Sequence, residues 1–199
     1  MKMAKKFLAV ALAGVLALSV LTGCGKSVKS KDIADSLTKM GVKTEQSDDV
    51  DKIAKSTLTA IEAIVNEPTN AAKPDTDTSK ITLDNAVVVF DGKVIKKNAF
   101  QSADIDNKVQ KALGMMDSGS AAETANKNKQ VQVALVKTEN AKKDASLQAH
   151  FVKGNLVPAN ANSVTNGKTV VEPGKLGTAK TKDGKYILVV IVNDVVDNT

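Results

Sequence analysis

The chain has 199 residues, of which 42% are hydrophobic and 25% are charged, a composition typical of a globular domain. This composition argues against collagen-like, disordered and multi-span membrane proteins. Aromatic residues make up only 3%, with no tryptophan and one tyrosine, so few rings are present to stack on sugars or bases. All 28 basic residues are lysines, so the forked guanidinium donor that often recognises phosphate and carboxylate groups is missing.

The first residues have the pattern of a secretory signal peptide. Lys2, Lys5 and Lys6 precede an uncharged apolar stretch from Phe7 to Leu21. This stretch is shorter than the ~20 residues that an α-helix needs to cross a hydrocarbon core about 30 Å thick. The pattern therefore predicts a cleaved export signal.

The apolar stretch ends at Leu21-Thr22-Gly23-Cys24, which resembles the lipobox of bacterial lipoproteins. In that family the signal peptidase cuts before a cysteine whose sulfur carries a diacylglycerol, and small residues precede the cut. The resemblance implies that Cys24 is the lipid attachment site and that the protein is anchored to the outer face of the cell membrane. The alternative is an ordinary cleaved signal in which Cys24 is incidental.

Cysteine usage and charge limit the other functions. Because Cys24 is the only cysteine, we expect no disulfide, no cysteine-based metal site and no other thiol nucleophile. Removal of residues 1–23 takes away three lysines and no acidic residue, which leaves 25 lysines against 22 acidic residues, a formal charge of +3. The lysines are spread along the chain, with no run longer than pairs such as Lys142-Lys143. This favours a solvated surface, and no nucleic-acid partner is expected.

The mature chain is predicted to form a single domain. Residues 1–23 are assigned to the signal peptide, residues 24–31 to the lipidated cysteine and a tether, and residues 32–199 to an extracytoplasmic domain. The tether, Gly25 to Lys31, is small, polar and basic, and is therefore expected to be flexible. A first helix should follow, with Ile33, Leu37 and Met40 on one face and Gly41 at its C-terminal end.

A second helix is the clearest element of the sequence. Ser47 is placed to cap it, and an apolar stripe at helical spacing continues from Val50 to Val65. Asp48, Asp49 and Asp51 lie in its first turn. These acids are the type that binds a metal, but their interaction with the helix dipole is the favoured interpretation.

The middle of the chain alternates polar loops with regular elements. Glu67 to Lys80 is expected to be a loop, because it contains two prolines and many polar residues. A hairpin is predicted over residues 86–96 around the turn dipeptide Asp91-Gly92. A third helix over residues 102–116 and a polar loop over residues 117–130 follow.

The C-terminal part is predicted to be mainly β-structure. Strands are expected near residues 131–137, 146–153 and 185–192, with turns at Asn166-Gly167 and Asp183-Gly184. Ile187 to Val192 is apolar without alternation, which is typical of a central strand covered on both faces. The order of elements predicts an α+β fold in which helices pack on a largely antiparallel β-sheet.

The sequence offers few residues for catalysis. His150 is the only histidine, and in the predicted strand it shares one side with Gln148, opposite Leu147, Ala149 and Phe151. We therefore expect it to face solvent or a loop that covers the sheet, and to play no part as a catalytic base. Zinc needs more histidine or cysteine ligands than this chain has.

Other known site patterns are also missing. The acidic stretches 75–78 and 104–107 lack the spacing, the glycine and the distal glutamate of an EF-hand calcium loop. Neither a P-loop nor a dinucleotide-binding glycine motif occurs. We therefore predict no catalytic residue, no metal ligand and no cofactor site.

Two further resemblances leave alternatives open. Residues 117–122 (DSGSAA) are similar to the segment at which exported FMN-binding domains attach flavin phosphate to a threonine, although Thr124, the nearest threonine, is out of register. The succession of a helix over 51–65, a loop, a hairpin, the short helix 100–114 and the C-terminal GKYILVVIV resembles the globular part of type IV pilin-like proteins. A pilin keeps its apolar N-terminal helix, whereas here that segment should be removed before Cys24.

The favoured interpretation is a lipid-anchored extracytoplasmic protein of the bacterial cell envelope that has a binding or structural role. Its expected partners are the membrane, through the lipid on Cys24, and an envelope protein or polymer. The alternatives are an FMN-linked or hydrolytic enzyme domain and a pilin-like assembly subunit. Polar residues that converge beside His150 and Tyr186 would mark a pocket, and a flat surface there would favour contact with a protein or polymer.

Overall fold

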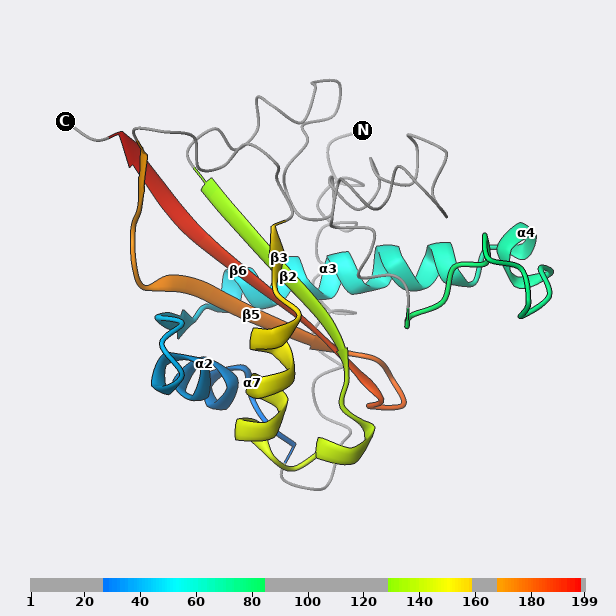
Figure 1. Ribbon diagram of the computed structural model, residues 1–199, viewed down its shortest axis with the longest axis horizontal. Helices are drawn as coiled ribbons and strands as arrows, with labels where there is room; N and C mark the ends of the chain where they lie inside the picture. Colours follow the sequence, from blue (N-terminus) through cyan, green and yellow to red (C-terminus); the bar gives the residue numbers. More distant parts are fainter. Residues whose placement is uncertain (1–26, 85–128, 159–167, 198–199) are drawn as a thin grey trace, which may run out of the picture.

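The computed structural model describes residues 27–84, 129–158 and 168–197 (Figure 1). Several sequence predictions lie outside these ranges: the lipid attachment site Cys24, the hairpin 86–96, the helix 102–116, nearly all of the loop 117–130, the flavin-like segment and the turn at 166–167. These points therefore remain predictions.

A mixed β-sheet forms the centre of the described chain. Its strands follow the order β1-β5-β6-β2-β3, and β4 also pairs with β6. Only the pairing of β1 with β5 is parallel, and the other four pairings are antiparallel. The strands are β1 (Thr44–Gln46), β2 (Lys129–Lys137), β3 (Val157–Pro158), β4 (Lys168–Val170), β5 (Gly174–Lys180) and β6 (Tyr186–Asp197). The predicted α+β class with a largely antiparallel sheet is confirmed.

Strand β6 is the central strand, as its continuous apolar sequence predicts. Residues 187–191 are all at most 1% exposed. Leu188 and Val190 belong to the apolar cluster on one face, whereas Ile187, Val189 and Ile191 belong to the cluster on the other. Both faces of the sheet are therefore covered, and Figure 1 shows helices on either side of the sheet.

Helix α3 (Asp48–Val65) covers one face and matches the predicted second helix. Ser47 occupies the N-cap position, but its side chain makes no capping hydrogen bond. The start of α3 lies directly on β5 at Gly177, where an added Cβ would come within 2.1 Å of the main chain of Val50 and Asp51. Only a residue without a side chain permits this approach.

The Asp51 carboxylate joins four segments beside this crossing. Its Oδ1 accepts hydrogen bonds from the Ser30 hydroxyl and the Thr178 backbone N–H, both at 2.7 Å. Its Oδ2 accepts one from Gln46 Nε2 at 2.8 Å. The carboxylate thus ties α3 to the start of α2, to β1 and to β5. The sequence pattern predicts that Asp51 acts on the helix dipole, and these bonds give it a specific structural role.

Helices α2 (Ser30–Lys39) and α7 (Ala145–Gly154) cover the other face. Helix α2 matches the predicted first helix, buries Ile33 and Leu37, and is followed by Gly41 at a φ of +90°. A short helix, α4 (Pro68–Ala71), lies within the segment predicted to be a loop, and a 3-10 turn (Glu139–Ala141) precedes α7.

The strand predicted over residues 146–153 is wrong, because this segment is helix α7. The Asp144 carboxylate accepts a hydrogen bond from the Leu147 backbone N–H at 2.9 Å and so caps the helix. The buried residues of this helix are Gln148, Ala149 and Val152, which have the spacing of one helix face. The alternation of Leu147, Ala149 and Phe151 instead suggests a strand.

The flexible tether predicted for residues 24–31 is also wrong over its second half. Helix α2 begins at Ser30, and Val28 is 7% exposed and packs in the cluster beneath α2 and α7. The Lys180 ammonium donates a 2.6 Å hydrogen bond to the Val28 carbonyl. Residues 28–31 therefore belong to the folded part of the protein.

Candidate functional site

A hollow of about 290 Å³ opens at the end of the sheet where β2 ends and β6 begins. This volume lies near the lower limit for small-molecule sites, which measure roughly 300–1,000 Å³. The residues that line it combine apolar and polar side chains: Leu83, Asp84, Leu135, Val136, Lys137, Phe151, Asn155 and Tyr186.

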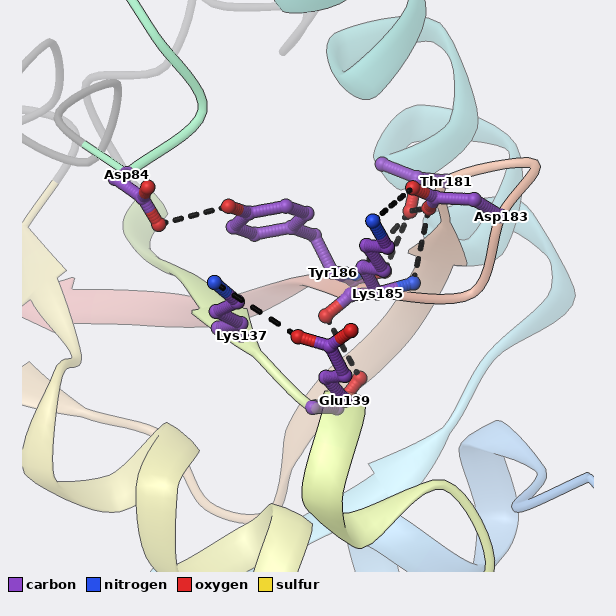
Figure 2. A network of polar contacts seen from close by, with 8 residues as sticks. Asp84, Lys137, Glu139, Thr181, Asp183, Lys185 and Tyr186 are labelled. Carbon is purple, nitrogen blue, oxygen red and sulfur yellow. Dashed lines mark hydrogen bonds and ion pairs between the residues drawn. The ribbon is translucent and has the colours of Figure 1, made fainter.

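Tyr186 and Lys137 are a cross-strand pair that lines the hollow. They face each other in the register of β6 and β2, and the Lys137 ammonium lies 6.0 Å from the centre of the Tyr186 ring. The Tyr186 hydroxyl donates a 2.7 Å hydrogen bond to Asp84 Oδ1, as Figure 2 shows. Two residues 102 positions apart in the chain are thus joined across the hollow.

The surroundings of Tyr186 keep its hydroxyl protonated. Burial makes the largest contribution, followed by the hydrogen bond to Asp84 and the negative charges of Asp84, Asp183 and Glu139, and together they raise the Tyr186 pKa to about 12. All of these effects disfavour a phenolate. At neutral pH the Tyr186 hydroxyl is therefore protonated and does not act as a base, and its hydrogen is donated to Asp84.

The tight turn between β5 and β6 holds Tyr186 in place. Thr181 exchanges hydrogen bonds with it, since its hydroxyl accepts from the Tyr186 N–H at 3.1 Å and its own N–H donates to the Tyr186 carbonyl at 3.1 Å. Gly184 takes a φ of +68° within this turn, which confirms the predicted Asp183-Gly184 turn. The Asp183 carboxylate accepts from the Thr181 hydroxyl at 2.6 Å and from the Lys185 N–H at 3.0 Å. These two bonds lower the Asp183 pKa and keep it ionised.

The network continues from the turn onto β2 (Figure 2). The Thr138 backbone N–H donates to the Lys185 carbonyl at 2.6 Å, and Lys137 pairs with Glu139 at 3.8 Å. The Lys137–Glu139 pair is about half exposed, and such a pair contributes little to stability. An anionic group that enters the hollow would therefore compete with Glu139 for the Lys137 ammonium.

The arrangement suits binding better than proton transfer. It offers a hydroxyl, an ammonium and an amide beside the apolar side chains of Leu83, Leu135 and Phe151. A general base or nucleophile needs a perturbed pKa that brings it toward neutrality, whereas that of Tyr186 moves away from it. Within residues 27–84, 129–158 and 168–197, no group of three or more His, Cys, Asp or Glu side chains is arranged to hold a metal ion.

His150 does not line the hollow. It lies on α7 and is exposed, so the expectation of a solvent-facing histidine is confirmed, although the strand that led to it does not exist. Gln148, expected beside it on the polar side, is instead 1% exposed and donates to the Ala141 carbonyl at 2.7 Å. The sequence had singled out Tyr186 as a place to look, but gave no sign of its partner Asp84.

The acidic stretch at residues 75–78 lies in the loop after α4, as expected. The Asp75 carboxylate pairs with the Lys80 ammonium at 2.7 Å, which lowers the Asp75 pKa. The Asp77 carboxylate accepts a hydrogen bond from the Ser79 backbone N–H at 2.8 Å. Both carboxylates thus have partners within the loop itself. The second acidic stretch, residues 104–107, lies outside the described ranges.

No model of a known protein family, no curated protein and no solved structure matches this chain.

Proposed function

We propose that this protein is a lipid-anchored extracytoplasmic binding protein of the bacterial cell envelope, which holds a partner at the membrane without transforming it. The observation that carries the proposal is the sequence Leu21-Thr22-Gly23-Cys24 at the end of a short apolar segment. The proposed partner besides the membrane is an envelope protein or polymer, and no nucleic acid is involved.

The position of Val28 is consistent with an anchor at Cys24. Val28 is buried in the folded part, and Lys180 holds its carbonyl. A lipid on Cys24 would therefore hold the folded part close to the membrane. Among the helices in the described part of the chain, none has the length and apolar character to span a bilayer.

The hollow beside Tyr186 supports a binding role for the folded part. Its polar groups donate or accept hydrogen bonds, and the Tyr186 pKa of about 12 keeps the ring from acting as a base at neutral pH. We further propose that residues from α2 to β6 form a single domain, because α2, α3 and α7 all pack on the same sheet.

Metabolic labelling with a radioactive fatty acid tests the anchor. We expect label in the native protein, none in Cys24→Ala, and release of the variant from the membrane fraction. A Ser27→Ala control should keep both label and retention, because Ser27 is exposed and lies beyond the cleavage motif. Fatty acid that still enters Cys24→Ala would overturn the assignment.

Variants of residues that line the hollow test whether the protein binds a partner there without catalysis. Purified native protein and Tyr186→Phe are compared for capture of envelope components, and we expect the variant to bind at least tenfold more weakly. Asn155→Ala serves as a second variant on the same hollow, and His150→Ala as a control outside it. Flavin absorbance in the purified protein, or chemical change of a captured component, would favour an enzyme domain instead.

A further inference from the structure

The two ends of the sheet differ in how their lysines are paired. At the end where β6 finishes, four lysines lie beside carboxylates, in the pairs Lys43–Glu172, Lys129–Asp194, Lys168–Asp197 and Lys175–Glu45. The register of β6 with β2, β4 and β5 places these residues at one end of the molecule. This end therefore presents a largely neutralised surface.

The end where β6 begins presents exposed lysines without such pairs. Lys142, Lys143 and Lys182 are exposed, and none of them forms an ion pair with another described residue. Lys142 acts on Asp183 only through its charge, as a minor contribution to the lowered Asp183 pKa. We call these three residues the free lysines.

Carboxylates near the free lysines are already bonded to other groups. Asp144 caps α7, Asp183 accepts hydrogen bonds within its own turn, and Glu139 pairs with Lys137. These carboxylates stay ionised, but their bonds keep them from forming ion pairs with the free lysines, whose side chains are exposed.

The chain enters the folded part at this same end. Lys180, whose ammonium holds the Val28 carbonyl, is the last residue of β5 and is followed directly by the turn that carries Lys182. Figure 1 shows the start of the described chain, the segment before α7 and the turn between β5 and β6 at the lower end of the view, away from the end of β6.

Covalent geometry keeps this end close to residue 24. Four Cα-to-Cα steps separate Cys24 from Val28, a reach of at most about 15 Å. Strand β6 has 12 residues and so extends for about 40 Å. A lipid on Cys24 would therefore hold the free lysines near the bilayer, with the neutralised end far from it.

We infer that the free lysines contact the anionic phospholipid headgroups of the membrane that carries the anchor, and that this contact fixes the orientation of the domain. The inference rests on the lipid anchor proposed above. Each lysine close to an anionic surface strengthens partitioning about fivefold, and salt screens the effect. The hollow beside Tyr186 lies at the same end of the sheet, so the orientation also brings it closer to the membrane than the neutralised end.

Orientation is measured on the processed, lipidated protein in vesicles of phosphatidylcholine with or without phosphatidylglycerol. Because the lipid consumes the thiol of Cys24, an introduced cysteine is the one free thiol and takes a fluorophore. Asn140→Cys places it at the end with the free lysines, and Val171→Cys places it at the opposite end, without a change of charge in either case. We expect headgroup-nitroxide lipids to quench the label at residue 140 about fivefold more than the label at residue 171 in anionic vesicles.

Charge variants test the role of the lysines. The triple variant Lys142→Gln, Lys143→Gln, Lys182→Gln should bring the two quenching values close together, as should high salt or vesicles without phosphatidylglycerol. The matched triple variant Lys43→Gln, Lys168→Gln, Lys175→Gln removes three paired lysines and should leave the difference intact. All six positions are on the surface, and circular dichroism checks that both variants fold.

Three other results would each contradict a different part of the proposal. Equal quenching of both labels in vesicle-bound protein would overturn the orientation and leave the anchor in place. A difference that is unchanged in neutral vesicles would overturn the headgroup contact, because the short connection alone would then set the orientation. Protein that washes off the vesicles would contradict the lipid anchor, and therefore also the proposed contact between the free lysines and the headgroups.

Discussion

The two faces of the central sheet are covered in different ways. Among the described helices, α3 covers one face, and its backbone rests on β5 at Gly177, where no side chain intervenes. On the other face α2 and α7 contact each other as well as the sheet, and their contacts are made by side chains such as Ile33, Leu37 and Val152. The first face combines one close approach of two backbones with side-chain packing along a single long helix, whereas the second spreads its packing over two short helices.

Charged substitutions in β6 should have the largest effect and should test both faces. Val190 and Val189 are each 0% exposed, and they point to the α3 face and to the α2 and α7 face, respectively. Burial of an unpaired carboxylate costs several kcal/mol, comparable with the ~5–15 kcal/mol of stability of a whole domain. We expect neither Val190→Asp nor Val189→Asp to fold, as measured by circular dichroism and thermal melting. An unchanged melting temperature in either variant would mean that its face is peripheral.

The close approach at Gly177 should make the α3 face intolerant of one added methyl group. In Gly177→Ala the new Cβ would lie 2.1 Å from the Val50 main chain, so the helix must move away from β5. Overpacking of this kind costs about 1–3 kcal/mol or more. Chemical denaturation should show this loss.

Gly154→Ala, at the end of α7 on the other face, is the matched control. Nothing lies within 4 Å of its added Cβ, and alanine favours a helix over glycine, so its stability should be equal or higher. Similar losses in both variants would contradict the distinction between the faces.

The Asp51 carboxylate should stabilise the α3 face through its hydrogen bonds. Asp51→Ala leaves the Thr178 N–H without its acceptor and removes one of the two carboxylates that accept from the Gln46 amide, so we expect a loss of about 1–3 kcal/mol in the free energy of unfolding. Asp49→Ala removes only an exposed pair with Lys52 and should have a much smaller effect. Equal effects would show that both acids act only through the helix dipole.

Tyr186 should make the edge of the α3 face sensitive to alkaline pH. Its pKa is raised from 10.0 to about 12, so the folded state favours the protonated ring. The resulting stabilisation is complete below pH 10 and is lost as the pH rises towards 12. Because the chain has one tyrosine and no tryptophan, ultraviolet absorbance of the tyrosinate follows this residue alone.

The Asp84→Asn variant tests the cause of this shift. Removal of the Asp84 charge should lower the Tyr186 pKa part of the way towards 10, because burial, the largest contribution, remains. A midpoint at the ordinary tyrosine value in the native protein would contradict the packing of this ring at the hollow.

His150 should give the smallest effect. It is exposed on α7, and His150→Gln should change the free energy of unfolding by less than about 0.5 kcal/mol. Thermal melting of the two proteins side by side is sufficient to measure this. A larger loss would show that the solvent side of α7 contributes to the packing of its face.

The α3 face was predictable from the sequence, and much of the other face was not. Helix α3 has 18 residues, so its apolar stripe repeats over several turns and excludes other periods. Helix α7 has ten residues, and Leu147, Ala149 and Phe151 alternate within it as they would in a strand. The signal that identifies it is Asp144, a residue that favours the N-cap, followed by small and helix-compatible residues.

Short strands and the site partners escaped prediction for a different reason. Strand β1 has three residues and is defined by its pairing with β5, about 130 positions further along the chain. Asp84 and Tyr186 are also far apart in the chain, by 102 positions. Asp84 lies in a loop, and no local feature of its sequence marks it as the partner of a tyrosine. A local sequence pattern predicts a helix or strand when the residues of that element determine its structure. It fails when the structure depends on contacts with a distant segment of the chain.

The place of β6 in the chain has a consequence for how the molecule can assemble. It is the last of the described strands, yet β2, β4 and β5 all pair with it and β1 reaches it only through β5. During synthesis from the N-terminus the earlier segments therefore have no central strand on which to align, and the sheet closes only when the final element emerges. A chain that is still being made therefore lacks the pairings that complete this sheet, and the described sheet forms late in synthesis.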